Sequence, residues 1–531
     1  MQASAPIIFL AAALSTAFGQ NPPSFDIADV HASVRSATPR APASFRASRY
    51  EIRQASMVEL IGTAYNVEFD NVVGGPSWLE ADRFDVIAKA APSTLPETAR
   101  LMLQTLLADR FKLAVHKETR PMPAFVLTVA KGKPKMKEAD GSGDTGCRPQ
   151  PPSDSRPYAW FICRNMTMEA LVARLRMSGG AYFPNPVIDS TGLKGTWNFE
   201  VGWAPKAQLT RLGADGISVF DAVEQQLGLK LEPQNVSTSV IVVDRVNEKP
   251  TDNPPGVTAR LPPPPPAEFE VASLKLSDPG EQPGGGTQSG GRVDMRAWPL
   301  RALIGLAWDV PPGQDFVGAP KWVDSAFVDV VAKVSVNIAQ ANGAPMPMSE
   351  LQPMLRTLLI DRFKMKTHYE DRPVDAYTLV AVKPKLQKAD PASRTRCKTD
   401  LAPVPRDSAA AGPPLIQAVC QNVTMAQFAD QLPSLAPSYL HYPVPDESAI
   451  EGAWDFTFTF SRSAPSGGGG RNQGRKGGGD PAPAADGAPD PSGGMSLFDA
   501  LTRQLGLKLE MQRRMAPVLV IDHIDEKPAG N

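Results

Sequence analysis

The residues best suited to acid–base chemistry occur as two matched sets in this 531-residue chain. Each set has an aspartate and an arginine, followed a few residues later by a histidine and a glutamate. The sets are Asp109, Arg110, His116 and Glu118, and Asp361, Arg362, His368 and Glu370. A carboxylate and an imidazole that share a site can exchange a proton with a substrate near neutral pH. Each set therefore contains the groups that an acid–base site needs.

A structural explanation accounts for the same residues. Asp109 and Arg110 close a segment of helical periodicity, where an arginine offsets the partial negative charge of the helix end. His116 follows an alternating segment in which Phe111 and Val115 face the core, so its imidazole faces solvent. The second set repeats this pattern. We favour the structural explanation and predict no catalytic residue.

Sequence signatures of common enzyme and cofactor sites are missing. The chain contains no H-E-x-x-H, no G-x-S-x-G and no G-x-x-x-x-G-K-[ST]. It has five histidines and no C-x-x-C pair, so the usual ligand sets for zinc and redox sites are missing too. We predict no metal site and no cofactor.

Composition excludes further classes of function. The net charge is −1, which provides no global field to attract nucleic acid or an anionic membrane. After the N-terminus no stretch approaches the ~20 apolar residues of a membrane span. The 54 prolines are about twice the usual share and indicate long extended linkers or loops.

The N-terminus has the pattern of a signal peptide. A short apolar core, residues 7–14, precedes small residues at 17 and 19, which predicts cleavage before Gln20. No Lys or Arg precedes the apolar core, and a buried N-terminal helix is the alternative. We predict a signal peptide over 1–19 and an exported protein, periplasmic or extracellular, without a membrane span after cleavage.

The chain contains the same unit twice. Between residues 217–250 and 495–528, 18 of 34 aligned positions are identical. Other landmarks recur in the same order. They include Leu106-Leu-Ala-Asp-Arg-Phe-Lys112 with Leu358-Leu-Ile-Asp-Arg-Phe-Lys364, Gly75-Pro-Ser-Trp78 with Ala319-Pro-Lys-Trp322, and Cys163-Arg-Asn-Met-Thr-Met168 with Cys420-Gln-Asn-Val-Thr-Met425. A tandem duplication explains this order.

The duplication defines the domains. We predict repeat unit 1 over 20–249, a Pro-rich linker over 250–267 and repeat unit 2 over 268–531. The linker should adopt an extended polyproline II form and act as a semi-rigid spacer. Residues 461–494 of unit 2 form a Gly/Pro-rich insertion that we predict to be disordered.

Each unit carries one pair of cysteines. In an exported chain an even number of cysteines indicates disulfides, with four buried free thiols as the alternative. The repeat predicts the pairs Cys147–Cys163 and Cys397–Cys420.

The hydrophobic patterns predict an α+β fold. Ser56 begins a helix over 57–65 with Glu59 completing a capping box, and Glu97–Ala108 forms a second helix. Residues 111–117 and 124–129 are expected to pair as a hairpin around Arg120-Pro-Met-Pro. A further copy of this pattern closes the unit, with a helix over 219–227 and two strands, 229–232 and 240–246. The expected module is strand–helix–strand–strand, with small, mostly antiparallel sheets covered by helices.

Two further pairs of residues recur in both units, one aromatic and one acidic. Trp78 and Trp322 follow a proline in a turn, where we favour plugging of a small core over an exposed binding anchor. Asp244 and Asp522 end the last strand of each unit and are expected to be solvated.

These landmarks resemble the exported, soil-bacterial family known as domain of unknown function 3738. The resemblance covers both units and rests on the Leu-Leu-x-Asp-Arg-Phe-Lys segments, the cysteine followed by Asn-x-Thr-Met, and Gln-Leu-Gly-Leu-Lys-Leu-Glu. It implies no established activity. Some relatives append such a domain to a membrane metallopeptidase of the antibiotic-sensor type, which implies a sensing or binding role in the envelope. The helix–strand–strand pieces also resemble, in shape only, the short N-terminal domain of secretins and TonB-dependent receptors.

The leading hypothesis is a non-catalytic binding or interaction module with an unidentified envelope or extracellular partner. The alternative is an exported hydrolase with a site in a cleft between subdomains, and a third class is a structural spacer. A cleft with convergent polar groups in both copies would favour the hydrolase. An exposed sheet edge or apolar patch would favour binding.

Export and disulfide formation can be measured together. We expect mature protein to begin near Gln20 and to contain no free thiol, and each disulfide to contribute about 3 kcal/mol by restricting the unfolded chain. Intact mass and thiol titration of protein recovered from the periplasm or medium check this. Four reactive thiols or a retained Met1 would contradict it.

Overall fold

The computed structural model describes residues 22–33, 41–46, 48–143, 145–151, 158, 160–213, 216–264, 267–278, 280–282, 284–288, 291–310, 314, 316–334, 348–401, 415–461 and 495–530. The predicted signal peptide and all but the first residue of the predicted insertion 461–494 lie outside these residues. The described part of the chain forms an α+β fold, as predicted, and each unit divides into two halves with separate hydrophobic cores.

The two halves of unit 1 have the same order of elements. Half A contains β1 (Ile27–Ala32), β2 (Ala41–Arg46), β3 (Arg49–Ser56), α1 (Met57–Tyr65), β4 (Val72–Gly74), β5 (Arg83–Lys89) and α2 (Pro96–Arg110). Half B contains β7 (Lys137–Glu138), β8 (Gly146–Gln150), β9 (Trp160–Met166), α3 (Met168–Ser178), β10 (Val187–Asp189), β11 (Trp197–Gly202), α4 (Leu209–Leu212) and α5 (Val219–Ala222), which a π-helical turn extends to Leu227.

Unit 2 repeats this order. Half C contains β13 (Val271–Leu276), β14 (Gly284–Gln288), β15 (Arg292–Pro299), α7 (Leu300–Ala307), β16 (Phe327–Lys333) and α8 (Met348–Phe363). Half D contains β18 (Gln387–Lys388), β19 (Arg396–Leu401), β20 (Leu415–Thr424), α9 (Met425–Leu435), β21 (Ala453–Ser461) and α10 (Leu497–Ala500), again extended by a π-helical turn to Leu505.

All four halves build the same antiparallel sheet. The strand orders are β1-β5-β3-β2, β7-β11-β9-β8, β13-β16-β15-β14 and β18-β21-β20-β19. In each half the four strands of this sheet come as three strands, a helix and a fourth strand. This element is larger than the expected strand–helix–strand–strand module, and it occurs twice in each unit. The predicted capping box at Ser56 and Glu59 is present and begins α1.

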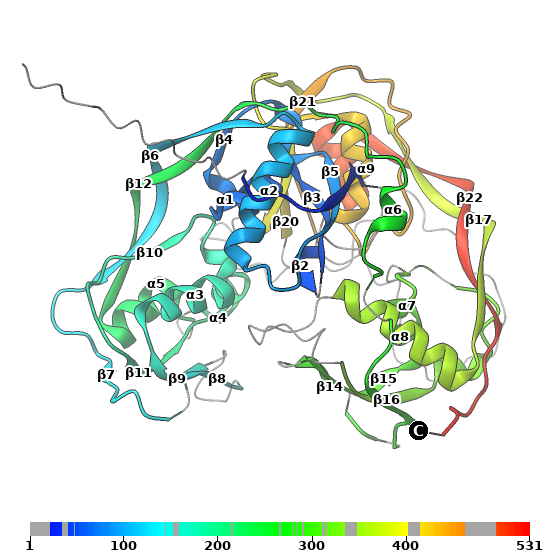
Figure 1. Ribbon diagram of the computed structural model, residues 1–531, viewed down its shortest axis with the longest axis horizontal. Helices are drawn as coiled ribbons and strands as arrows, with labels where there is room; N and C mark the ends of the chain where they lie inside the picture. The colour runs from blue at the N-terminus through cyan, green and yellow to red at the C-terminus, as the bar shows by residue number, and fades with distance from the viewer. Residues whose placement is uncertain are drawn as a thin grey trace, which may run out of the picture.

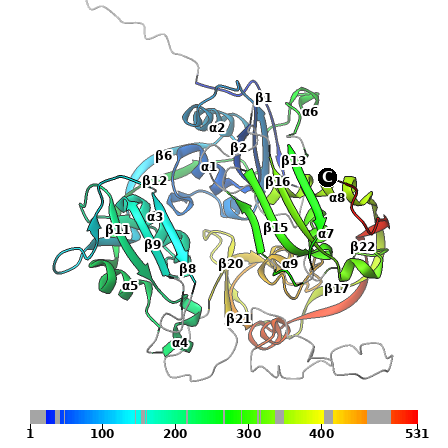
Figure 2. The ribbon, with the colours of Figure 1, turned by 90° about the horizontal axis from the view of Figure 1, so that it is seen from below.

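A long two-stranded ribbon joins the halves of each unit. In unit 1 it consists of β6 (Ala114–Val129) and β12 (Leu229–Arg245), and in unit 2 of β17 (Lys366–Ala381) and β22 (Leu507–His523). The ribbons lie on opposite sides of the molecule (Figures 1 and 2). The expected hairpin over 111–129 is wrong, because β6 runs straight through Arg120-Pro-Met-Pro and pairs with β12 instead.

A continuous strand tolerates Pro121 and Pro123 because, at these positions, an N–H would point away from β12 and would not be needed for pairing. Phe125 donates its N–H outward, away from β12, to the carbonyl of Pro186 (2.7 Å). Pro121 and Pro123 have the same parity as Phe125, so their missing donors also lie on the outer edge, where proline is tolerated. The expected strands 229–232 and 240–246 are likewise the two ends of one strand, β12.

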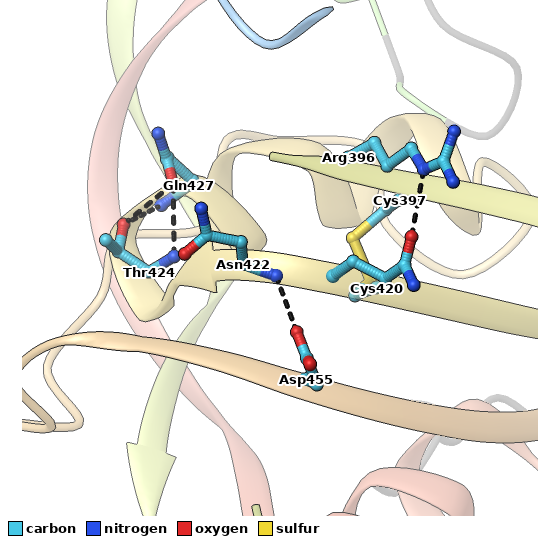
Figure 3. Close-up of a disulfide and its surroundings, with 8 residues drawn as sticks. Arg396, Cys397, Cys420, Asn422, Thr424, Gln427 and Asp455 are labelled. Atoms are coloured by element: carbon cyan, nitrogen blue, oxygen red, sulfur yellow. Dashed lines mark hydrogen bonds between the residues drawn. A yellow bond between two sulfur atoms is a disulfide. The ribbon is translucent and has the colours of Figure 1, made fainter. Parts of the chain in front are cut away.

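The recurring Cys-x-Asn-x-Thr-Met segment is a structural device (Figure 3). In half D, Cys420 forms a disulfide with Cys397 on the neighbouring strand, and Asn422 has a positive φ at a bulge. The Asp455 carboxylate accepts the Asn422 N–H (2.7 Å), and the Thr424 hydroxyl caps α9. Half B repeats this around Asn165, and its disulfide joins Cys147 to Cys163, so both disulfides have the pairing that the repeat predicts.

The arginine of the Asp-Arg-Phe-Lys segment holds the chain that leaves the ribbon. Arg110 is buried and donates to the Thr251 carbonyl (2.5 Å) and to Asn253 Oδ1 (2.6 Å). In unit 2, Arg362 donates to the carbonyls of Ala272 and Gly530. The predicted linker over 250–267 therefore makes contacts with half A at its start rather than serving there only as an extended spacer. Residues 251–253 pack on half A, and α6 (Val257–Arg260) contacts β1.

Halves A and D contact each other across the two units. Arg394 of half D is largely buried and donates to the carbonyls of Gly74 (2.5 Å) and Val72 (3.4 Å) in half A. Its neighbour Thr395 donates its N–H to the Ser77 carbonyl (3.0 Å). The contact places Arg394 3.7 Å from the Glu80 carboxylate, which compensates part of the cost of burying a cation.

The Arg110 contacts predict where unit 1 ends as a stable fragment. We expect a chain of residues 20–262 to be more stable than one of residues 20–250 by about 3 kcal/mol, because the shorter chain leaves a buried guanidinium without its partners. Urea unfolding of both fragments measures the difference.

The same pair of fragments carrying Arg110→Met provides the control. Without the guanidinium the difference between the two lengths should become smaller, because residues 251–253 then lose Arg110 as a partner while Asn253 keeps its bonds to Asp29 and Val30. Equal stability of the two wild-type fragments would show that the contact contributes nothing.

Candidate ligand-binding cleft

A cleft of about 540 Å³ lies between the two halves of unit 2. One wall is the middle of β17, from Arg372 to Tyr377, and the opposite wall is the segment Tyr439–Tyr442, which follows α9. Val317 of half C and Val518 of β22 close one end. The size is in the range of natural small-ligand sites.

The aromatic wall is fixed by contacts behind it. Tyr439 is buried, donates its hydroxyl to the Ser461 carbonyl (3.0 Å) and lies 6.0 Å, ring to ring, from Phe498. Tyr377 of β17 packs on the same Phe498 ring (5.0 Å). Phe498 thus holds both walls of the cleft in position.

His441 is the one imidazole in the lining. Its Nδ1 atom is buried and has no hydrogen-bond partner among the described residues, while the ring bonds the Pro437 carbonyl. Burial lowers the pKa of His441 below its ordinary value of 6.5, and the bond to Pro437 acts in the opposite direction. At neutral pH the imidazole is therefore neutral.

Charged groups lie at the edge of the cleft. Arg372 pairs with Glu370 (2.8 Å), and both side chains are about 40–50% exposed. Asp375 lies 3.7 Å from Arg513 across the ribbon and is also exposed. These pairs are solvated, so they leave the apolar and aromatic groups to provide most of the binding energy.

Unit 1 has different residues at the equivalent place. Tyr182 matches Tyr439, since its hydroxyl also donates to the carbonyl that ends the neighbouring strand (Ala204, 2.7 Å). The next three residues, Phe183, Pro184 and Asn185, replace Leu440, His441 and Tyr442. The ring of Phe183 packs against Phe125 (5.4 Å) and Phe220 (5.8 Å), so aromatic packing fills this region in unit 1.

The duplicated polar residues do not form one site. Asp109 is exposed and lies 3.7 Å from Lys112, whereas His116 bonds Asp244 (2.9 Å). His368 bonds Asp522 at the same distance. Asp244 and Asp522 are exposed at the ends of β12 and β22, as expected, and each also bonds an imidazole on the ribbon.

The His–Asp pairs lie on exposed surface. The side chains of His116 and Asp244 are 53% and 46% exposed. The neighbouring Glu118 accepts a bond from Arg120 (2.7 Å), which lowers the pKa of its carboxyl. A solvated dyad without a pocket cannot exclude water or orient a substrate, so these pairs alone do not make a catalytic centre.

In the part of the chain that the structure describes, the two tryptophans pack on hydrophobic cores and the potential metal ligands do not converge. Trp78 and Trp322 are half-buried and pack on the cores of halves A and C. Within the described part of the chain no three His, Cys, Asp or Glu side chains converge as a metal site, and no helix is long and apolar enough to cross a membrane.

Sequence reasoning missed the cleft. Its distinctive residues, His441 and Tyr442, lie where the two copies differ, whereas the repeat pattern singles out residues that the copies share. A signal was present in the sequence. A tyrosine and a following Pro-Val pair occupy matching positions in both copies, but the three residues between them differ.

The comparison with protein families gives one result. The family described as protein of unknown function (DUF3738) matches residues 58–246 and 301–524. The chain belongs to this family. Each match begins in the first long helix of a unit and ends just past the ribbon, so a DUF3738 match spans both halves of a unit.

The other two comparisons found no match. No curated protein and no solved structure matches the chain. The resemblance to the short N-terminal domain of secretins and TonB-dependent receptors stays a prediction.

The buried imidazole predicts a pH-dependent stability. Because folding holds His441 neutral, the unfolded chain binds its proton at a higher pH than the folded chain does. The corresponding stability is present above the unfolded pKa, about 6.5, and is lost as the pH falls further. We expect His441→Gln to reduce the loss of stability between pH 7.5 and pH 5, measured by urea unfolding.

The matched control is His523→Gln. His523 is about half exposed and bonds Asp525 on the surface. Its replacement should therefore leave unchanged the loss of stability with falling pH that His441 produces. An unchanged slope in the His441 variant would show that the imidazole is not held neutral.

Proposed function

We propose that this protein is a non-catalytic binding module that works outside the cytoplasm and takes its ligand in the cleft of unit 2. The observation that carries the proposal is the cleft itself, about 540 Å³ in volume, whose lining includes Tyr377, Tyr439 and Tyr442. Aromatic side chains offer a large apolar contact area, which is typical of small-ligand sites.

Export remains part of this proposal. Two disulfides are compatible with an oxidising compartment and are rare where thiols are kept reduced. The signal-peptide pattern supports the same location, periplasmic or extracellular. The partner is then an envelope or extracellular molecule.

The hydrolase alternative has less support. A site shared by both copies would favour it, but His441 and Tyr442 have Pro184 and Asn185 as their counterparts in unit 1. The groups that both copies do share, the His–Asp pairs, are about half exposed. A ligand site that arose in one copy fits recognition better than a duplicated catalytic centre.

Filling the cleft tests the proposal. We expect indole, a small aromatic with one N–H donor, to bind wild-type protein with a dissociation constant on the order of 1 mM, or about −4 kcal/mol. Val374→Trp places an indole ring in the cleft and should abolish the saturation-transfer NMR signal of added indole.

The matched control is Met122→Trp. Met122 has the same position on the ribbon of unit 1 as Val374 on that of unit 2, and both are half-buried. This variant should keep the wild-type signal. Absence of binding to wild type, or equal loss in both variants, would overturn the proposal.

A further inference from the structure

A second cavity, of about 590 Å³, lies in half A of unit 1. All of its lining residues lie between Gly62 and Asn71. One wall is the last turn of α1 with the residues that follow it, and the other is a short 3-10 helix, Phe69–Asn71. None of these residues lines the cleft of unit 2, so the two cavities are separate sites.

The cavity has one aromatic side chain in its lining, Phe69, which is 36% exposed. Its ring lies against the backbone of Gly62, where an added Cβ atom would be 2.5 Å from Phe69 Cδ1. Only glycine leaves space for the ring at this distance, so α1 holds Phe69 in position while part of the ring stays open to solvent. A ring that is fixed in advance loses little conformational entropy when a ligand stacks on it.

Three neutral polar side chains line the same cavity, those of Thr63, Asn66 and Asn71. Within the described part of the chain, none of the three has a side-chain hydrogen bond, so their donors and acceptors are available to a ligand. The backbone at Asn66 is held by the end of α1, because Asn66 has a positive φ and donates its N–H to the Gly62 carbonyl. Each asparagine amide offers both a donor and an acceptor.

The one charged residue of the lining is already neutralised. Glu68 accepts two hydrogen bonds from Arg176 of α3 (2.9 and 3.2 Å), and these bonds lower the pKa of the Glu68 carboxyl. A metal ion needs several oxygen ligands with excess negative charge, and an anionic ligand needs a cation. The lining supplies neither in excess, which favours a neutral ligand.

The shape of the remaining requirement is specific. The ligand has to present an apolar face to one ring and several hydroxyl or amide groups around it. A pyranose ring does this, because its C–H bonds gather on one face and its hydroxyls, each a donor and an acceptor, lie at its rim. A purely apolar ligand would leave the amides of Asn66 and Asn71 unpaired, at a cost in binding.

From these observations we propose that unit 1 binds a neutral saccharide in this cavity. One pyranose ring stacks its C–H face on Phe69, and its hydroxyls bond Thr63, Asn66 and Asn71. The inference goes beyond the proposed function, because it assigns a second site, in the other unit, and the chemical class of its ligand.

Unit 2 lacks this combination of groups. Leu306 stands where unit 1 has Thr63, and Asp309 stands where unit 1 has Asn66. The Asp309 carboxylate already accepts a bond from within unit 2 (3.2 Å). Residues 311–315, which correspond to the stretch with Phe69, contain no aromatic side chain. We therefore expect one saccharide per chain.

The test uses full-length protein and three neutral trisaccharides, cellotriose, maltotriose and triacetylchitotriose, each titrated by saturation-transfer NMR. We expect at least one of them to give a saturable signal, strongest at its ring C–H protons. Phe69→Leu keeps an apolar side chain against Gly62 but removes the aromatic ring. It should weaken binding about tenfold, the scale of one lost ring contact.

A second variant tests the polar groups. Thr63→Val with Asn71→Ala should also weaken binding about tenfold, through lost hydrogen bonds. It replaces Phe69→Leu as the deciding variant if the latter fails to unfold cooperatively in urea. The matched control is Leu101→Ala, which removes an exposed apolar side chain of the same half outside the cavity and should leave the affinity unchanged.

The outcomes separate this site from the cleft of unit 2. Val374→Trp, which fills that cleft, should leave saccharide binding unchanged, and Phe69→Leu should leave indole binding unchanged. The inference is wrong if none of the three trisaccharides binds, or if wild type and the folded Phe69→Leu variant bind with equal affinity. Loss of saccharide binding in Val374→Trp alone also contradicts it, because the ligand then lies in unit 2.

Discussion

Reciprocal exchange of the last strands is the constraint on which this fold depends. β6 starts in the core of half A and ends in that of half B, where Leu127 is fully buried. β12 runs the opposite way and delivers Ile241 and Val243 to the core of half A. Neither core of a unit is complete without the strand that begins in the other. The register of one ribbon therefore fixes both halves, since a slip by one residue would turn these side chains out of both cores at once.

The residues that recur between the copies serve this architecture. Arg110 and Arg362 tie down the chain after the ribbon, and Asn165 and Asn422 occupy positive-φ bulges before a capped helix. Asp85 and Asp329 perform a similar task in halves A and C, where each carboxylate accepts the N–H of a bulge residue with positive φ, Gln54 or Ala297. These polar residues recur because the same backbone groups need hydrogen-bond partners in each copy, rather than because a reaction is repeated.

The two copies differ at the cleft and at the contact between the units. In unit 1 β10 pairs with Phe125–Leu127 of the ribbon, whereas in unit 2, with Pro445 in place of Ile188, one bridge between Leu379 and Asp446 remains. Arg394 provides a contact between the units for which unit 1 has Asp144 at the matching position. Each unit has its own cores, so residues outside those cores can differ between the copies without loss of the fold.

The sequence by itself determined the duplication, the α+β class, the pairing of the cysteines and several local elements, including the capping box at Ser56. These follow from side-chain periodicity, capping residues and repeated spacing, all of which act over a few residues. Strand partners and sites were decided only by the tertiary structure. Arg120-Pro-Met-Pro has the local pattern of a turn, yet it is strand, because β12 lies 100 residues away in sequence and prolines are harmless on the outer edge. His116 meets Asp244, and His441 faces β17, for the same reason. The ribbon brings these residues together, and the sequence around each one does not indicate its distant partner.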